Sequence, residues 1–387
     1  MKIVHVVPTL IKGGGERVAA ILANEAAKVG HEVTIVAACA VDSAQLQDSL
    51  RPDVTVRFVS AGASSRIARY ATLPIWLLRQ RAWLFRQDII HCHLTYGAVV
   101  GAAVMTMRAV SRASRPVIVE TYHAVGMPIP RLKRWIHARM AARRDALVLM
   151  GGDDYWRSFV RAHPALLTST ILNGVADHSH EAIDTDVRVN YRRQLGIPDD
   201  CLHVVGTVGM LRPDRKPWLY LEIFAEIAGV FGQAVHFIMA GAGPEAHRIR
   251  SLIREYRLEN QVHLPGLVMD PRVPLSAMDL YLSMNIGPVA GVAAMEAALS
   301  TLPQLAIQLQ PNYRRNPDDW IWSSADPVEI SRKAVQLLRS PEARKKLAHQ
   351  QREYVQLHHS VEGMARSYSS LYNAAITRID ERTTASK

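Results

Sequence analysis

Cysteine is scarce in this sequence, and several patterns that would assign a protein class at once are absent. Only Cys39, Cys92 and Cys201 occur among 387 residues, and no two of them form a Cys-x-x-Cys pair. A disulfide framework is therefore not expected. The opening MKIVHVV lacks the basic stretch and long apolar core of a signal peptide. No apolar run reaches the ~18 residues of a membrane-spanning helix. We therefore expect a reducing, cytoplasmic location.

The first βαβ pattern lacks the dinucleotide-binding fingerprint. Residues 2–7 and 32–38 predict buried strands, and the triplet at 13–15 leads into a helix over 16–29. Its glycines do not have the Gly-x-Gly-x-x-Gly spacing, and no acidic residue clearly ends the second strand. A nicotinamide-dependent enzyme is therefore disfavoured.

The formal net charge of +11 lies almost entirely in the first half of the chain. Residues 1–180 hold 22 Lys and Arg against 12 Asp and Glu. Two stretches of this half, 66–86 and 131–144, interleave arginines with tryptophan and aliphatic residues. The first is either a cationic amphipathic segment that lies on an anionic membrane or a surface helix with solvated arginines, and the second is predicted to be a cationic amphipathic helix, which could also bind nucleic-acid phosphates. No RNA- or DNA-binding motif accompanies them, so a nucleic-acid partner is not expected.

The alternation of strands and helices occurs twice, which predicts two α/β domains with parallel sheets. A polar, turn-rich stretch over 177–200 separates the two series. Further strands are predicted at 54–59, 88–91, 117–121, 146–150, 202–210, 235–240, 262–266, 279–283 and 304–307, and the last helices at 327–338, 341–358 and 361–378.

Two candidate site groups follow predicted strands of the second half. Arg212, Arg215 and Lys216 come directly after the strand at 202–210, where three cations can neutralise a diphosphate. Gly291 follows the strand at 279–283 and starts an alanine-rich helix. A helix N-terminus of this kind suits a phosphate, and the alternative interpretation is an ordinary βα connection.

Histidines mark two strand ends of the first half. His123 follows the strand at 117–121, and ligands bind at the carboxyl edge of open parallel sheets. His91 and His93 flank Cys92, but the sequence offers no third ligand nearby. No metal site is therefore predicted.

Six short motifs follow one another along almost the whole chain. They are a Gly-Gly-x-Glu turn, a Thr-x-His strand end, an Asn-Gly-Val stretch, a Gly-Met-Leu-Arg-Pro-Asp loop, an Ala-Gly-Ala-Gly-Pro-Glu turn and a Met-Glu-Ala helix segment, at 13–16, 121–123, 173–177, 209–214, 240–245 and 295–297. In this order they resemble glycosyltransferase family 4. The resemblance implies the GT-B architecture, with two facing Rossmann-like domains and a C-terminal helix, here 361–380, that crosses back to the first domain.

The resemblance also implies a retaining, metal-independent transfer from a nucleotide-diphosphate sugar, with UDP favoured over GDP and no cofactor. Residues 1–180 correspond to a basic, membrane-facing acceptor domain and 181–360 to the donor domain. The acceptor would be a saccharide or a polyprenyl-diphosphate-linked saccharide, in surface polysaccharide, lipopolysaccharide or glycolipid synthesis at the inner face of the cell membrane. By correspondence with the family, the catalytic residues are His123, Arg215 and Lys216, and the donor-binding residues are Gly13, Gly14, Gly209, Arg212, Gly291, Val292 and Glu296.

The chain departs from the family pattern at two positions. The first Glu of the Glu-x7-Glu motif is replaced by Pro288, and the Arg of the Arg-x4-Lys pair by Met210. Glu296 matches the second Glu, which in the family holds the ribose. Two alternatives therefore stay open: a non-catalytic GT-B binding or scaffold protein, and a sugar-nucleotide epimerase of the same fold.

Overall fold

The chain divides into two compact units in a computed structural model. The first unit comprises Met1–Gly174 and Val361–Lys387, and the second comprises Val175–Ser360. The predicted boundary at residue 180 falls outside the described residues. The structure describes residues 1–10, 13–40, 46–60, 70–123, 130–150, 154–177, 185–268, 270–285, 290–309 and 320–385.

The first unit is built on a seven-stranded parallel sheet in the order β3-β2-β1-β4-β5-β6-β7. Its central strands are runs of valine and isoleucine that are buried on both faces, as expected of a parallel sheet covered by helices. The strands are β1 (Lys2–Val7), β2 (Glu32–Cys39), β3 (Val54–Ser60), β4 (Ile89–His93), β5 (Val117–Tyr122), β6 (Ala146–Leu149) and β7 (Leu167–Thr170).

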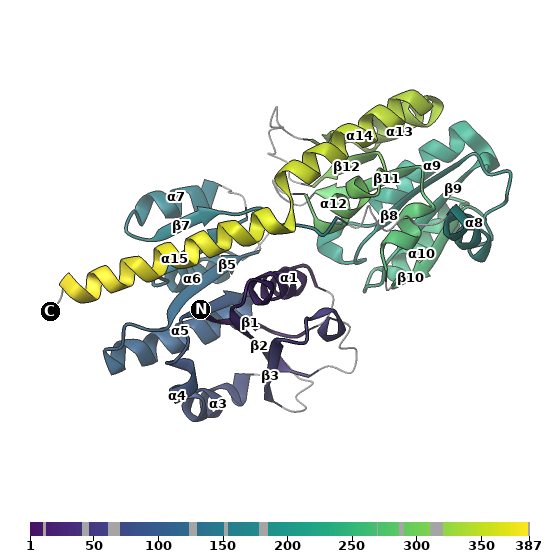
Figure 1. Cartoon of the computed structure of the whole chain (residues 1–387). Coiled ribbons are helices and arrows are strands. Elements are labelled where there is room, and N and C mark those ends of the chain that lie inside the picture. Colours follow the sequence, from purple (N-terminus) through teal and green to yellow (C-terminus); the bar gives the residue numbers. More distant parts are fainter. Residues whose placement is uncertain are drawn as a thin grey trace. The chain divides into compact units, whose positions relative to one another are not determined.

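Helices connect these strands and cover the sheet (Figure 1). They are α1 (Gly14–Lys28), α3 (Leu73–Arg79), α4 (Arg81–Leu84), α5 (Leu94–Ser111), α6 (Arg131–Ala141), α7 (Asp154–Ala162) and α15 (Val361–Ala385), with a 3₁₀ turn η1 (Gln47–Ser49). Helix α5 is the one described helix that is long and apolar enough to cross a membrane by length and composition alone. Sequence analysis did not single it out, because threonine, glycine and arginine interrupt its apolar residues. In this structure α5 is the crossover between the parallel neighbours β4 and β5 and packs against both.

Helix α15 completes the core of the first unit, which confirms the predicted return of the C-terminal helix. Figure 1 shows α15 running along this unit near α1 and β5, and it contacts both. Its buried residues Met364, Tyr368 and Tyr372 pack in one cluster with Ile3 and Val117 of the sheet. An apolar face of the first sheet is therefore covered by residues that follow the second unit in the chain.

The second unit repeats the architecture with a six-stranded parallel sheet in the order β10-β9-β8-β11-β12-β13. Its strands are β8 (His203–Val208), β9 (Val235–Ala240), β10 (Val262–Gly266), β11 (Leu280–Asn285), β12 (Gln304–Gln308) and β13 (Ser323–Ser324). Its helices are α8 (Thr185–Gln194), α9 (Leu219–Phe231), α10 (Ala246–Glu255), α11 (Arg272–Ser276), α12 (Val292–Leu299), α13 (Pro327–Arg339) and α14 (Pro341–His358), with 3₁₀ turns η2 (Pro213–Arg215) and η3 (Gly232–Ala234).

The sequence suggested that the polar stretch over 177–200 is a linker, but the structure shows that part of it is folded. It contains α8, and two arginines of this helix bind one aspartate. Arg188 Nη2 and Arg192 Nη2 lie 2.7 Å and 2.9 Å from the carboxylate oxygens of Asp279, which also accepts from the Val204 amide. The charged side chains that gave the segment its linker-like composition therefore anchor it to the second sheet.

Candidate functional site

Each sheet has one point where the strand order reverses. In the first unit it lies between β1 and β4, and in the second between β8 and β11. At such a point the two connecting helices leave on opposite faces, which opens a crevice at the carboxyl ends of the strands. The predicted site residues follow these strands or their immediate neighbours, so each unit brings its own group together at one sheet edge.

The glycine turn after β1 presents the start of α1. Gly13 is the residue before the helix, with extended backbone, and Gly14 is its first residue. A Cβ at Gly14 would meet nothing within 4 Å, whereas one at Gly13 would lie 2.3 Å from the Glu16 carboxylate. Glu16 is buried, and burial raises its pKa. The open backbone at Gly14 leaves room for a ligand against the free N–H groups of the helix.

His123 lies at the end of a row of histidine rings that crosses three strands. Its Nε2 is 3.2 Å from His93 Nδ1, and His93 Nε2 is 3.1 Å from His5 Nδ1. His5 and His93 are fully buried, whereas His123, directly after β5, is partly exposed. Burial lowers the pKa of His5 to about 3 and that of His123 to about 4, and it lowers the pKa of His93 well below its ordinary value. The three rings are therefore neutral at pH 7.

A second hydrogen-bonded group lies beside this row and joins β4 and β5 to α15. His91 Nδ1 lies 2.7 Å from the hydroxyl of Tyr372, and His91 Nε2 lies 2.7 Å from Thr121 Oγ1. Thr121 Oγ1 is in turn 2.9 Å from the hydroxyl of Tyr368. Both tyrosines thus give a polar tip to an otherwise apolar helix face. Tyr368 contacts the end of β5 that carries His123, and Tyr372 contacts β4.

The structure places a third histidine, His5, beside His91 and His93, where the sequence had offered no third metal ligand. His5, His91 and His93 each offer one nitrogen within 4.8 Å of the others, the one such group among the described residues. His5 was missed because it stands on a neighbouring strand far away in sequence. Imidazole nitrogens suit zinc, copper or nickel. However, both nitrogens of His91 already have hydroxyl partners at 2.7 Å. The expected absence of a metal remains a prediction.

The loop after β8 carries the predicted phosphate-binding cations, but one of them has a partner. Arg212 makes a two-pronged ion pair with Asp214, at 2.9 Å and 2.5 Å. This pairing lowers the pKa of Asp214, mainly through the hydrogen bond from Arg212. Arg215 and Lys216 form no ion pair with any described residue, and Lys216 is exposed. The charge available to an anion at this edge therefore rests on these two residues.

Close backbone contact fixes the start of the same loop. Gly209 is exposed directly after β8, and a Cβ built on Gly241, after β9, would lie 1.8 Å from the Gly209 carbonyl oxygen. Gly241 also has a φ of +154°, which disfavours any side chain. The two glycines thus let adjacent βα loops lie against each other. Met210, in place of the family arginine, is 52% exposed.

Helix α12 begins at the predicted residue. Gly291 precedes it with extended backbone, Val292 is its first residue, and Glu296 lies one turn into the helix, partly buried. Burial raises the pKa of Tyr281 on β11, and the charge of Glu296 adds to that rise. Pro288 lies outside the described residues.

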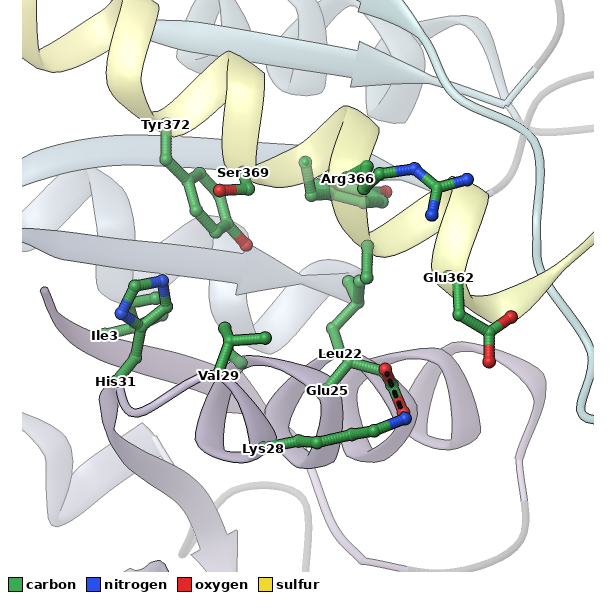
Figure 2. Close-up of a pocket in the computed structure, with 13 residues that line it drawn as sticks. Ile3, Leu22, Glu25, Lys28, Val29, His31, Glu362, Arg366, Ser369 and Tyr372 are labelled. Carbon is green, nitrogen blue, oxygen red and sulfur yellow. Dashed lines mark ion pairs between the residues drawn. The ribbon is translucent and has the colours of Figure 1, made fainter.

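A separate pocket of about 300 Å³ occurs in the first unit, between α1 and α15 (Figure 2). Ile3 and His31 contribute to it from the beginning of β1 and the residue before β2, so it lies at the opposite sheet edge from His123. Figure 2 shows the Glu25–Lys28 ion pair on its α1 side. Sequence reasoning missed this pocket because its two walls come from helices at opposite ends of the chain.

Comparison with protein families gives one match for each unit. Residues 12–150 match the model described as Glycosyltransferase Family 4, and residues 203–340 match that of Glycosyl transferases group 1. A curated relative is the O-antigen biosynthesis glycosyltransferase WclY of Escherichia coli, 22% identical over 230 residues. That alignment covers 57% of this chain and 61% of the relative, so it spans somewhat less than two thirds of the relative's length.

Solved structures show the same fold over nearly the full length. The Anabaena protein Alr3699/HepE, in complex with UDP and glucose, superposes with a TM-score of 0.78 at 17% identity, covering 97% of this chain and all of that one. The Staphylococcus aureus protein TarM, as a point mutant in complex with fondaparinux, alpha-GlcNAc-glycerol and UDP, gives a TM-score of 0.72 at 12% identity. It covers 96% of this chain and all of that one.

Proposed function

The chain belongs to glycosyltransferase family 4 and has the GT-B architecture, and on this basis we propose that it transfers a sugar from a UDP-sugar to a saccharide or lipid-linked saccharide, with retention of anomeric configuration. The product would belong to a surface polysaccharide or glycolipid. Support for this class comes from the name of the WclY relative, and support for UDP comes from the ligands named with the Anabaena and Staphylococcus aureus structures.

One observation carries the proposal. At the reversal point of the second sheet, a glycine-led helix follows β11 and two cations without ion-pair partners among the described residues follow β8. The helix N-terminus offers backbone N–H groups and the positive end of its dipole. Arg215 and Lys216 add two full positive charges. This combination suits a diphosphate, because the helix holds its N–H groups in place before the ligand arrives and the two cations add full positive charge.

Each site residue has a distinct task in this proposal. Glu296 accepts hydrogen bonds from the two ribose hydroxyls, since a carboxylate offers two oxygens side by side. A Cβ built on Gly209 or on Gly14 would meet nothing within 4 Å, so the backbone of each residue is open to a ligand on its own unit. His123 hydrogen-bonds the donor sugar. Arg212 is held by Asp214, so its task is to shape the loop rather than to carry free charge.

The reaction balances without a paired-carboxylate arrangement. The bond between the anomeric carbon and the diphosphate oxygen breaks, and the acceptor oxygen bonds to that carbon on the same face. The acceptor hydroxyl proton passes to the departing phosphate oxygen. Arg215, Lys216 and the α12 N–H groups stabilise the charge that develops on the leaving diphosphate. Loss of one such contact typically costs about 3 kcal/mol of activation free energy.

Calorimetric titration with UDP, GDP and their common sugar conjugates tests the donor site. We expect micromolar binding of UDP that weakens at least tenfold in Glu296→Ala. Glu255→Ala is the matched control, because Glu255 ends α10 at the opposite sheet edge and is exposed. Failure of every nucleotide to bind would overturn the proposal and leave the non-catalytic alternative. A changed nucleotide sugar in the absence of any acceptor would instead indicate an epimerase.

We further propose that the first unit docks on an anionic membrane surface through α6. This helix exposes apolar side chains between its cations: Leu132 is 69% exposed, Trp135 is 53% exposed and Ile136 is 44% exposed. The Arg139 guanidinium lies 5.2 Å from the centre of the Trp135 ring. Exposed apolar residues beside arginines combine insertion into the lipid interface with attraction to anionic headgroups.

Sedimentation with vesicles containing anionic phospholipid tests this docking at low and high salt. We expect the wild-type protein to bind at low salt and to be released as salt is raised, because the attraction is screened. The double variant Leu132→Glu/Trp135→Glu should lose binding. Leu357→Glu, which changes a 76% exposed residue of α14, should keep it. Binding of neutral vesicles alone, or equal binding by both variants, would contradict the proposal.

A further inference from the structure

The row of rings at β1, β4 and β5 is continuous from the sheet interior to the predicted site. His5 Nδ1 contacts His93 Nε2 at 3.1 Å, and His93 Nδ1 contacts His123 Nε2 at 3.2 Å. Among the described residues, Nδ1 of His123 has no hydrogen-bond partner, and it is not among the fully buried atoms that lack one. His123 itself is partly exposed. Within the part of the chain that the structure describes, the row therefore ends on a ring nitrogen without a hydrogen-bond partner.

The number of protons on this row is fixed by burial. Because burial lowers the pKa of all three histidines, each ring is neutral and carries one N–H. His93 lies between two ring nitrogens and can donate to only one of them. If it donates to His123, it accepts from His5; if it donates to His5, it accepts from His123. The tautomers of the three rings are therefore coupled, and only two arrangements satisfy both contacts.

The buried end of the row distinguishes the two arrangements. Nε2 of His5 is buried and has no hydrogen-bond partner. If His93 donates to His5, this nitrogen carries a proton that has no acceptor. If His93 donates to His123, this nitrogen carries only a lone pair. Buried donors without partners are rarer than under-satisfied acceptors. The favoured arrangement places the His5 proton on Nδ1, and both following rings then carry theirs on Nδ1 as well.

We propose that His5 and His93 are positioning residues that hold the proton of His123 on Nδ1, so that His123 presents a hydrogen-bond donor to an oxygen of the bound sugar. The ligand class at this atom is then an oxygen that accepts, such as a hydroxyl or ring oxygen. His123 neither takes the acceptor proton nor attacks the anomeric carbon. The chemical role rests on the proposed glycosyl transfer, but the tautomer itself does not.

The neighbouring ring explains why a metal is not needed to account for this cluster. Both nitrogens of His91 are hydrogen-bonded to hydroxyl groups at 2.7 Å. A metal held by His5, His91 and His93 would have to displace at least one of these contacts. The hydrogen bonds leave a single nitrogen of the three rings without a partner, His5 Nε2.

Nitrogen-15 NMR of protein labelled in its histidines measures the tautomers directly, without substrate. Protonated and bare ring nitrogens resonate in well-separated ranges. Assignment uses single-histidine variants. We expect His123 and His93 as neutral Nδ1–H tautomers at pH 7. An Nε2–H proton on His123 in the free protein would overturn the proposal, whatever the enzymatic activity proves to be.

Two substitutions of equal size at position 93 separate positioning from packing. Asparagine places an amide N–H where His93 Nδ1 lies, and aspartate places an acceptor there. His93→Asn should keep His123 on Nδ1–H, with kcat within about threefold of wild type. His93→Asp should move the proton to Nε2 or add a second one, and lower kcat about ten- to a hundredfold with UDP affinity unchanged, as for other residues that fix a histidine tautomer. Equal effects of both variants on tautomer and turnover would indicate a packing role only.

Position 5 provides the same comparison where the position 93 variants do not fold. His5→Asn keeps a donor toward His93, and His5→Asp reverses it, so the NMR contrast should repeat. Zinc is the alternative occupant to exclude. Elemental analysis of the purified protein should find less than a tenth of an equivalent, and added zinc should leave the histidine signals unchanged. One equivalent of zinc that is lost in both position 5 variants would overturn the proposal. A correct tautomer in a protein without transferase activity would refute the proposed function and leave this arrangement standing.

Discussion

Replacement of Arg144 by methionine should destabilise the first unit strongly. The Arg144 side chain is buried; its Nε lies 2.6 Å from a Glu120 carboxylate oxygen, and its Nη2 lies 2.6 Å from the Ala98 carbonyl oxygen. Glu120 is only 2% exposed, so without Arg144 its charge would stay buried and uncompensated. Such a loss typically costs about 3–5 kcal/mol, compared with a total stability of about 5–15 kcal/mol for an ordinary domain.

The double variant Glu120→Leu/Arg144→Met tests this reasoning. It removes both charges, so the buried-charge penalty disappears and the remaining cost is the Ala98 carbonyl oxygen without its donor, about 1–3 kcal/mol. We therefore expect the double variant to be more stable than Arg144→Met alone. Hydrogen–deuterium exchange of the β5 amides in increasing denaturant gives the free energy of opening for this unit separately. A double variant less stable than Arg144→Met would refute the reasoning.

Three further predictions follow from buried contacts. Tyr372→Phe leaves a histidine nitrogen on β4 without its 2.7 Å partner, and amide exchange in the first unit should report a loss of about 1 kcal/mol. Burial lowers the pKa of His5 to about 3, so between that pH and the ordinary value of about 6.5 the unfolded chain binds a proton that the folded chain does not. The contribution of His5 is complete above pH 6.5 and falls by about 1.4 kcal/mol per pH unit as the pH drops from 6.5 toward 3. Burial lowers the pKa of His93 and His123 as well, so denaturant titrations should show the stability falling by at least this much per pH unit. Gly241→Ala would place a Cβ 1.8 Å from the Gly209 carbonyl oxygen, so thermal unfolding should show a loss of more than about 2 kcal/mol in the stability of the second unit. The control Gly229→Ala lies in an open position of α9 and should raise the stability by about 0.5–1 kcal/mol.

The sequence predicts most strands of both sheets because their signal is local. Runs of valine and isoleucine bounded by glycine or proline identify buried parallel strands, and Lys2–Val7 and Val235–Ala240 agree residue for residue with the prediction. The start of α12 was predicted equally well, since a glycine before an alanine-rich run is a local signal too.

The parts that sequence reasoning missed depend on partners far away in the chain. From its sequence alone, helix α8 resembles a polar linker. Its arginines Arg188 and Arg192 bind Asp279, which lies far away in the chain, and the sequence does not show this contact. Arg212 was predicted to be a cation available to a phosphate. Its ion pair with Asp214, only two residues away, could have been inferred from the sequence. His5 reads as one polar residue in an apolar strand. Which side chains His5 contacts depends on which strands pair with β1, and the periodicity of the sequence does not give the order of strands in the sheet.

The place of α15 in the fold determines the order in which the chain can fold as it is synthesised. Residues 175–360 form a contiguous unit and can fold once they have left the ribosome. Residues 1–174 emerge earlier but lack the helix that covers Ile3 and Val117. Multidomain chains usually fold from the N-terminus onward. Here the first unit has to wait for the second, with an apolar sheet face exposed throughout that interval, and a fragment that ends at residue 174 is expected to aggregate where 175–360 stays folded.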